Sequence, residues 1–192
     1  MRIIAGQYRG RTISMPGSIR PTQDRVREAI FNVIKEVVPG ALVLDLFAGS
    51  GAFGIEALSR DAQSVVFVDN NIKCIRIIRE NLSFVEEAPQ KTQLLKLEAV
   101  KAIERLEKQI QAFDLVFLDP PYYKGLARNS LIKIGACDIL KTSGFVIAEH
   151  SKKDELPRET GVLRLFKEKR YGDTVVSFYN RSQVSGRRSQ AE

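Results

Sequence analysis

Residues 119–122, Asp-Pro-Pro-Tyr, place a carboxylate, a fixed carbonyl and an aromatic ring side by side. They follow the apolar run FDLVFL of residues 113–118, which is typical of a strand buried on both faces of a parallel sheet. Neither proline can donate a backbone hydrogen bond, and Pro121 restricts Pro120 to an extended conformation. These residues therefore predict a stiff corner at the carboxyl end of a strand, where open α/β sheets bind ligands.

This corner suits a planar group that carries an amino substituent. The carboxylate of Asp119 and the carbonyl of Pro120 can accept the two N–H protons of the amine. The ring of Tyr122 can stack on the planar group. The alternative is a strand-ending turn whose aspartate only caps a helix. A glycine-rich turn elsewhere in the chain favours the binding site.

That turn follows the apolar run ALVLDL of residues 41–46. Gly49, Gly51 and Gly54 come next within FAGSGAFG, and an apolar helical pattern continues from there. A strand, a glycine turn and a helix in this order direct backbone N–H groups at a nucleotide-like or carboxylate-bearing ligand. Asp69 ends the next apolar run 20 residues after Gly49, where an acid that binds ribose hydroxyls is expected.

The glycine spacing alone fits either NAD or S-adenosylmethionine. Asp45 lies inside the strand, four residues before the first glycine, and together with the proline corner it favours S-adenosylmethionine. A dehydrogenase has no need for a fixed corner that holds an amine. It usually needs a proton-transferring residue, and the only histidine, His150, is expected to be structural or at the surface.

Basic residues gather in the first 28 positions. Arginines at 2, 9, 11, 20, 25 and 27 stand against Asp24 and Glu28, an excess of four positive charges. They fall on an expected hairpin of residues 2–14 and on a helix that Thr22 would cap, with an apolar stripe from residue 29 to 37. Either these arginines lie on a solvated surface or they contact phosphates, and the guanidinium fork favours phosphate.

The rest of the chain alternates short apolar runs with helical patterns, which indicates an α/β open sheet. Strands are expected at 41–46, 65–68, 93–97, 113–118 and 145–149, followed by an antiparallel pair at 163–171 and 174–180. We expect an N-terminal hairpin extension (1–20), one main domain (21–181) and a disordered tail (182–192).

Composition restricts the class of protein. Thirty Lys and Arg against 23 Asp and Glu give a net charge of +7, which suggests a polyanionic partner. Cys74 and Cys137 are isolated, so we expect a reducing cytoplasm, no disulfide framework and no metal site. The start does not read as a signal peptide, and no apolar run approaches the roughly 20 residues of a membrane span. No spare amphipathic element is visible, so a monomer is expected.

Four stretches carry a family resemblance: RIIAGQYRGR, RPTQDRVREAIFN, LDLFAGSGAFGIEALSR and FLDPPY. The chain resembles the bacterial 16S ribosomal RNA guanine-N2 methyltransferases of the RsmD type. The first two stretches are specific to that family, and the last two are shared with DNA adenine and protein-glutamine methyltransferases. The resemblance implies a Rossmann-like methyltransferase fold, a mostly parallel sheet with an antiparallel C-terminal hairpin. It also implies S-adenosylmethionine as cofactor and 16S rRNA or the small ribosomal subunit as partner.

The resemblance also implies roles for particular residues. The catalytic set is Asp119, Pro120 and Tyr122. The cofactor-binding set is Asp45, Phe47, Gly49, Gly51, Asp69, Glu98 and Ala99, in which Glu98 either contacts the adenine amino group or is an exposed acid at a helix start. The RNA-binding set is Arg9, Arg11, Arg20, Arg25 and Arg27. The alternatives are methylation of DNA adenine N6 or of a protein glutamine, and RNA binding without catalysis.

Overall fold

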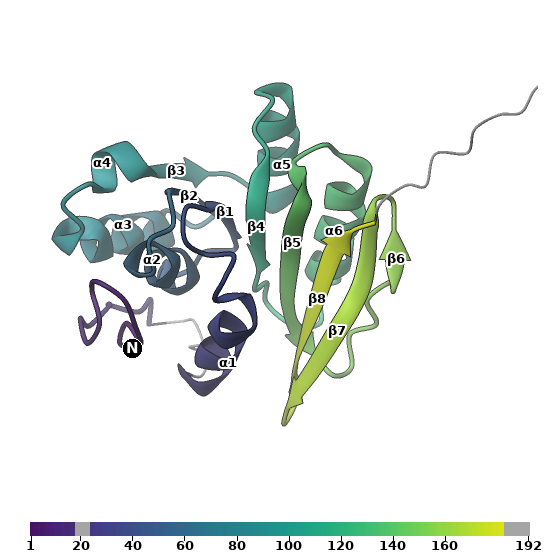
Figure 1. Ribbon diagram of the computed structural model, residues 1–192, viewed down its shortest axis with the longest axis horizontal. Helices are drawn as coiled ribbons and strands as arrows, with labels where there is room; N and C mark the ends of the chain where they lie inside the picture. Colours follow the sequence, from purple (N-terminus) through teal and green to yellow (C-terminus); the bar gives the residue numbers. More distant parts are fainter. Residues whose placement is uncertain (18–23, 183–192) are drawn as a thin grey trace, which may run out of the picture.

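Eight strands form one mixed sheet in the computed structural model, which describes residues 1–17 and 24–182 (Figure 1). The strands are β1 (Leu42–Leu46), β2 (Ser64–Asp69), β3 (Thr92–Lys96), β4 (Phe113–Leu118), β5 (Leu140–Ser151), β6 (Glu159–Thr160), β7 (Leu163–Tyr171) and β8 (Thr174–Arg181). Their spatial order is β3-β2-β1-β4-β5-β8-β7-β6. Parallel pairing joins β3, β2, β1, β4 and β5, and antiparallel pairing adds β8, β7 and β6. The expected α/β fold is confirmed.

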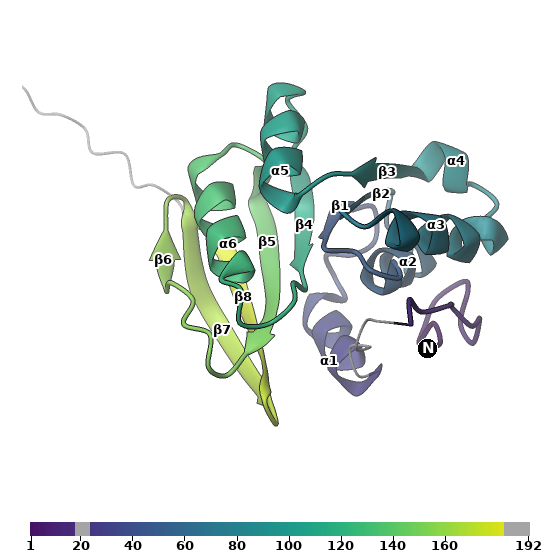
Figure 2. The same cartoon turned by 180° about the vertical axis from the view of Figure 1, so that it is seen from behind.

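Helices cover both faces of the parallel half of the sheet (Figures 1 and 2). They are α1 (Asp24–Ile34), α2 (Ala52–Ser59), α3 (Ile72–Asn81), η1 (Leu82–Phe84, a 3-10 turn), α4 (Ala88–Lys91), α5 (Ala99–Lys108) and α6 (Leu126–Ala136). One hydrophobic cluster joins α1, α2 and α3 to the sheet, and a second joins α5 and α6 to the opposite face. Burial on both faces explains why β1 and β4 are almost continuously apolar.

The parallel register aligns the carboxyl ends of β1 and β4. Leu46 pairs with Leu118, so the residues that follow both strands leave the sheet at the same edge. From β1 the chain moves to β2 on one side, and β4 lies on the other side of β1. This reversal of strand order is the topological switch point at which open α/β sheets bind ligands.

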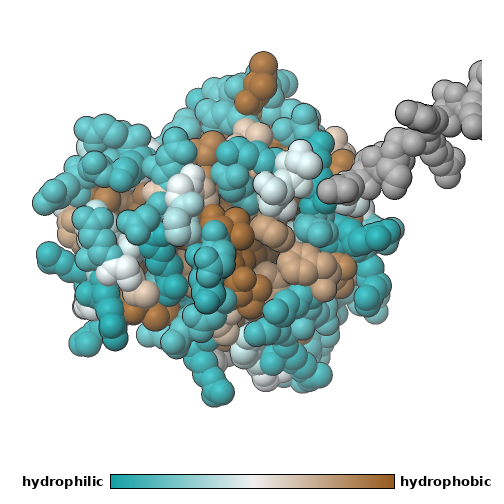
Figure 3. Space-filling view, viewed as in Figure 1, coloured by the Kyte–Doolittle hydropathy of each residue, from teal (hydrophilic) through white to brown (hydrophobic). Residues whose placement is uncertain are grey.

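The antiparallel part of the sheet is less covered on the face that Figure 1 shows. The ring of Phe166 packs there against two others, with its centroid 5.6 Å from that of Phe145 and 6.3 Å from that of Phe178. Phe166 is 46% exposed. Figure 3 shows hydrophobic side chains near the middle of a face that is otherwise mainly hydrophilic.

The N-terminal segment, residues 1–17, folds back on itself and packs on α2. Instead of two strands, it has an isolated bridge between Arg2 and Thr12. Ile3 and Ile13 are buried in the cluster shared with α1 and α2. Gly6 has a φ of 80°, and a Cβ there would lie 1.6 Å from the carbonyl oxygen of Ser59, so only glycine allows this close approach.

Several element boundaries differ from those expected. The first helix ends at Ile34 instead of continuing to residue 37. Strand β5 begins at Leu140 instead of residue 145, and Cys137 directly follows α6. Thr22, Arg20 and nearly all of the expected tail lie outside the described residues. Within the described ranges, no helix has both the length and the apolar character to cross a membrane.

Candidate active site

The glycine turn between β1 and α2 is tied to the end of β2 by one carboxylate. One carboxylate oxygen of Asp69 accepts the N–H of Gly49 at 2.9 Å, and the other accepts the N–H of Asn71 at 2.8 Å. Phe47 has a φ of 61°, a conformation that costs a residue with a side chain about 1–2 kcal/mol. The structure thus holds a strained turn against Asp69, in the place where the sequence predicted a nucleotide-like ligand.

Helix α2 lies unusually close to β2 directly after this turn. A Cβ on Gly54 would lie 2.2 Å from the ring of Phe67. The third glycine of the pattern therefore serves helix–strand packing. Asn81 of α3 stabilises the turn, because its side-chain amide donates a hydrogen bond to the carbonyl of Ser50 at 2.9 Å.

Asp45 is the most perturbed acid of the site. It is buried within β1, and one carboxylate oxygen accepts the N–H of Gly54 at 3.0 Å. Burial raises its pKa to about 8; the bond from Gly54 opposes this rise, and the nearby carboxylates of Asp119 and Asp69 add to it. Three carboxylates therefore gather at the ends of β1, β2 and β4.

Such a group of acids fits a cationic ligand. S-adenosylmethionine carries a sulfonium and an ammonium group, and either charge would favour the ionised form of Asp45. A carboxylate has about four lone-pair positions, so Asp69 keeps capacity to accept from ribose hydroxyls beside its two backbone N–H groups. The residues present thus fit the cofactor that the family implies.

The acid expected at the adenine is placed differently from the other three. Glu98 directly precedes α5, where it is exposed and lies 3.9 Å from the ammonium of Lys101. Ala99 begins the helix and is buried. Both residues follow β3 at the same edge of the sheet, and the contacts of Glu98 are those of an exposed acid at a helix start. A contact with adenine stays a prediction.

The Asp-Pro-Pro-Tyr corner follows β4 and is anchored to β5 and β8. The hydroxyl of Tyr122 donates to a carboxylate oxygen of Glu149 at 3.0 Å and lies 3.0 Å from the hydroxyl of Thr174. Burial raises the pKa of the Tyr122 phenol, and Glu149 and Asp119 contribute to the rise. Pro120 is buried and Asp119 is half-buried. The ring of Tyr122 is thus held in one orientation by its hydroxyl.

A second aromatic residue, which the sequence reading did not single out, follows the corner. Tyr123 has a φ of 63° and is 66% exposed. Its ring stands at 81° to that of Tyr122, with 6.1 Å between the centroids. Ser151 donates a hydrogen bond to its phenol oxygen at 3.2 Å. Two adjacent tyrosines were the available signal, but the different orientations of their rings depend on a backbone angle that the sequence does not reveal.

The predicted RNA-binding arginines separate into exposed and buried ones. Arg9, Arg11 and Arg25 are exposed, and the guanidinium of Arg11 lies over the ring of Phe84, 5.8 Å from its centroid. Arg20 lies outside the described residues. The prediction that Arg27 grips phosphates is wrong in this structure, because its side chain is fully buried.

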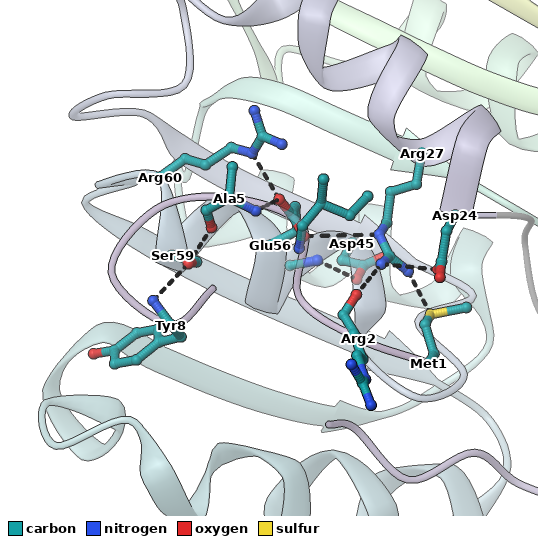
Figure 4. A network of polar contacts seen from close by, with 12 residues as sticks. Met1, Arg2, Ala5, Tyr8, Asp24, Arg27, Asp45, Glu56, Ser59 and Arg60 are labelled. Carbon is teal, nitrogen blue, oxygen red and sulfur yellow. Dashed lines mark hydrogen bonds and ion pairs between the residues drawn. The ribbon is translucent and has the colours of Figure 1, made fainter. Parts of the chain in front are cut away.

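Arg27 instead joins three parts of the chain inside the core (Figure 4). Its guanidinium donates to the sulfur of Met1 and to the carbonyl of Arg2 in the N-terminal segment. It pairs with Asp24 at 3.2 Å on its own helix and with Glu56 of α2 at 3.8 Å. Burial lowers the pKa of its guanidinium, and Glu56 and Asp24 oppose that shift.

Glu56 completes this connection, which we call the N-terminal clasp: Met1, Arg2, Ile4, Ala5, Asp24, Arg27, Glu56, Ser59 and Arg60. The two carboxylate oxygens of Glu56 accept the N–H groups of Ile4 and Ala5 at 2.8 and 3.0 Å. Arg60 donates to Glu56 at 2.8 Å. The clasp fixes the N-terminal segment to α2, the helix that starts at the glycine turn.

Among the described residues, the titratable groups form no cluster of the kind that a metal site requires. Within residues 1–17 and 24–182, no group of three or more His, Cys, Asp and Glu side chains could hold a metal ion. His150 is buried, with its ring nitrogens 2.9 Å from the carbonyl of Ser151 and 2.9 Å from the hydroxyl of Ser177. Burial lowers its pKa, and its contact with Ser177 joins β5 to β8.

The fold and the site together define a class. A parallel sheet with antiparallel C-terminal strands, a glycine turn at the switch point and an Asp-Pro-Pro-Tyr corner are those of an S-adenosylmethionine-dependent methyltransferase. Residues 1–180 match the family model described as "Conserved hypothetical protein 95". The chain belongs to this family, which comprises the RsmD-type methyltransferases of ribosomal RNA, and the resemblance seen in the sequence is confirmed.

Individual relatives agree with this assignment. The "Putative rRNA methyltransferase YlbH" of Bacillus subtilis is 38% identical over 94% of this chain and 99% of its own length. The "Ribosomal RNA small subunit methyltransferase D" of Escherichia coli K12 is 33% identical over 94% of this chain and 90% of its own length. The solved structure of a "Putative methyltransferase yhhF from Escherichia coli" superposes with a TM-score of 0.80, at 31% identity over 94% and 97% of the two chains.

Proposed function

We propose that this protein transfers a methyl group from S-adenosylmethionine to the exocyclic N2 amine of a guanine in 16S rRNA of the small ribosomal subunit. The observation that carries the proposal is the alignment of β1 with β4, which brings the corner at Asp119 beside the glycine turn. The proposed amine site would thus adjoin the proposed cofactor site. The family supplies the substrate class, because curated relatives bear the name of a small-subunit rRNA methyltransferase.

The corner would overcome the poor nucleophilicity of the guanine amine. The lone pair of N2 is delocalised into the ring, so it must be turned out of the ring plane before it can attack. Asp119 and the carbonyl of Pro120 accept hydrogen bonds from the two N–H groups and favour a tetrahedral nitrogen. The bound cofactor supplies an electrophilic methyl group on its sulfonium.

Proton transfer follows from the same contacts. The amine becomes acidic only when its nitrogen acquires a fourth bond, so a weak base is sufficient. The carboxylate of Asp119, which already accepts a hydrogen bond from the amine, takes up the released proton or passes it to solvent. Asp45, Gly49, Gly51 and Asp69 hold the cofactor in this scheme, with Asp69 on the ribose hydroxyls.

The target base has to leave its stack to reach the corner. The ring of Tyr122 stacks on it and compensates part of the cost of unstacking, which is a few kcal/mol. Because its hydroxyl is bonded to Glu149 and Thr174, the ring is already oriented when the base arrives. Preorganisation of this kind reduces the entropy that binding must overcome.

Arginines of the N-terminal segment and α1 would bind RNA phosphates. Arg9, Arg11 and Arg25 are exposed and suited to this role. We propose the same role for Arg20 because of its position in the sequence. We propose further that the enzyme acts as a monomer in the cytoplasm, where ribosomal subunits assemble.

The proposal is tested by the product. The protein and S-adenosylmethionine are incubated with small-subunit particles from cells that lack this activity, and nucleosides of the digested RNA are identified by mass spectrometry. New N2-methylguanosine is the expected result. Methylated adenosine would overturn the base assignment, and methylation of DNA or of a protein glutamine without RNA product would overturn the substrate class. RNA binding without cofactor binding would contradict an enzymatic role.

A further inference from the structure

A pocket adjoins the corner on the side away from the cofactor turn. Its volume is about 330 Å³, and Pro121, Tyr123, Lys124, Arg128, His150 and Lys153 are among the residues that line it. The lining includes Pro120, Pro121 and Tyr122 of the corner but none of the residues of the glycine turn. The turn follows β1, whereas the pocket lies towards β5 and the start of α6, so the corner separates the two sites.

One wall of the pocket presents an exposed aromatic ring in a strained backbone conformation. Tyr123 has a φ of 63°, which costs a non-glycine residue about 1–2 kcal/mol. The residue is 66% exposed, although its phenol oxygen accepts a hydrogen bond from Ser151 at 3.2 Å. Strain that displays an aromatic ring to solvent beside a substrate corner is the kind of local cost found at ligand sites.

Cations from two separate elements lie around this ring. Lys124 precedes α6, Arg128 lies in its first turn, and Lys153 follows β5. None of the three forms an ion pair within the described part of the chain. An aromatic ring beside unpaired cations is the combination that binds a nucleotide, with the base on the ring and the phosphate on the cations.

The other charged groups of the pocket do not cancel this character. Asp154 accepts the N–H of Ser151 at 3.1 Å, so its carboxylate serves its own turn. Glu155 is exposed at the rim. His150 is neutral, because burial lowers its pKa and its ring nitrogens lie within hydrogen-bond distance of Ser151 and Ser177. Three cations against two acids leave the lining with one net positive charge.

We propose that this pocket holds the ribonucleotide next to the target guanine, with its base stacked on Tyr123 and its phosphate among Lys124, Arg128 and Lys153. The inference rests on the proposed function and deepens it. A base in the corner on Tyr122 leaves its neighbour in the strand one phosphate away, and the pocket continues from Tyr122 to Tyr123 and the three cations. The two tyrosines divide the work: Tyr122 stacks on the base that reacts, and Tyr123 stacks on the base that flanks it.

The experiment measures RNA affinity and product formation in the same set of full-length variants. Binding of a labelled single-stranded RNA of about ten nucleotides is followed by anisotropy over a range of salt concentrations. Tyr123→Leu removes the ring but keeps the strain, and it should weaken RNA binding about tenfold. Tyr123→Phe restores the ring and should bind nearly as well as the wild type.

The cations are tested in the double variant Lys124→Ala/Lys153→Ala. Its slope of log affinity against log salt should fall by up to about 0.7, because the three cations share one phosphate and each neutralised phosphate of a single strand contributes about 0.7. Lys108→Ala is the matched control, since Lys108 is exposed at the end of α5, at the opposite edge of the sheet. S-adenosylmethionine affinity and melting temperature should stay at wild-type values in every variant.

The outcomes separate the subsite from the proposed function. Wild-type affinity and an unchanged salt slope in Tyr123→Leu and in the double variant, in an enzyme that still forms N2-methylguanosine, overturn the subsite alone. A wild-type protein that forms no N2-methylguanosine overturns the proposed function, whereas the binding data still decide the subsite. A wild-type protein with no RNA affinity overturns both. Equal losses in Tyr123→Phe and Tyr123→Leu overturn the stacking role.

Discussion

Arg27 and Glu56 form an ion pair that is shut away from solvent, with 3.8 Å between Nε of Arg27 and Oε2 of Glu56. The pair connects α1 to α2 and, through the carbonyl of Arg2 and the N–H groups of Ile4 and Ala5, connects both helices to the N-terminal segment. Because α2 starts at the glycine turn, the clasp supports the cofactor site from behind. Arg27 therefore serves the fold, while its neighbour Arg25 faces solvent.

The first prediction concerns Arg27→Met, which leaves Glu56 buried without one of its cations. Breaking a buried pair on one side should lower the free energy of unfolding by about 3 kcal/mol. Urea unfolding followed by circular dichroism measures this loss. Arg25→Met is the matched control on the same helix and should stay within about 0.5 kcal/mol of the wild type. Equal stability of the two variants would contradict the clasp.

The second prediction concerns the exposed arginines. Arg25→Ala should reduce the slope of log RNA affinity against log salt by about 1 and leave stability unchanged. The same change is expected separately for Arg9→Ala. Arg11→Ala should show the same change in slope and should also lose the contact between the guanidinium and the ring of Phe84. Salt slopes equal to that of the wild type in all three variants would return these residues to an ordinary solvated surface.

The third prediction follows from the raised pKa of Asp45. Its value is 3.8 in an unfolded chain and about 8 in the folded protein, so the folded state binds more protons between these pH values. The stability that protonated Asp45 provides is complete below pH 3.8 and is lost as the pH rises through about 8. When the pH is raised from about 6 to about 8, the wild type should therefore lose up to about 2 kcal/mol more unfolding free energy than Asp45→Asn. Parallel pH curves for the two proteins would show that Asp45 is not protonated in this range.

Cofactor binding should respond to the same group in the opposite sense. A cationic ligand favours the ionised carboxylate, so S-adenosylmethionine affinity should increase as the pH rises towards 8, with release of a proton on binding. Calorimetry at about pH 7 in buffers of different ionisation enthalpy measures the proton directly. Asp45→Asn should abolish the proton release. Release that persists in this variant would assign the proton to another residue.

The fourth prediction concerns the anchor of the corner. Tyr122→Phe keeps the ring but removes the hydrogen bonds to Glu149 and Thr174, which should cost about 1–2 kcal/mol of stability. The loosened ring should reduce kcat about tenfold with little change in cofactor affinity. Tyr122→Ala should reduce kcat further, because the stacking surface is also lost. A fully active Tyr122→Phe enzyme would show that orientation of the ring is unimportant.

Much of the fold was predictable because its signals are local. Apolar runs marked β1, β2, β3, β4 and β5, and the patterns at residues 163–171 and 174–180 marked the hairpin of β7 and β8. The corner was visible because two consecutive prolines restrict the backbone without help from the rest of the protein. The glycine turn and Asp69 were visible through their spacing, and the structure joins them by a hydrogen bond of 2.9 Å.

Long-range contacts were not predictable in this way. Arg27 shares the spacing of Ile30, Phe31 and Ile34, one buried face of α1, and its charge hid a signal that periodicity alone would have given. Its partner Glu56 lies on another helix, and so nothing local revealed the pair. The N-terminal segment does not form the expected two-stranded hairpin. It is instead held by contacts with Glu56 and Ser59 that span more than 50 positions.

The central claim is that the corner holds the reacting amine, and Asp119→Ala tests it most directly. The rate of N2-methylguanosine formation on small-subunit particles is measured in single turnover, together with the S-adenosylmethionine dissociation constant of the same preparation. We expect the rate to fall by about a hundredfold or more, with cofactor affinity within a few-fold of the wild type. A variant that still methylates at a rate near the wild type, or one that loses cofactor binding together with transfer, would contradict the role assigned to Asp119.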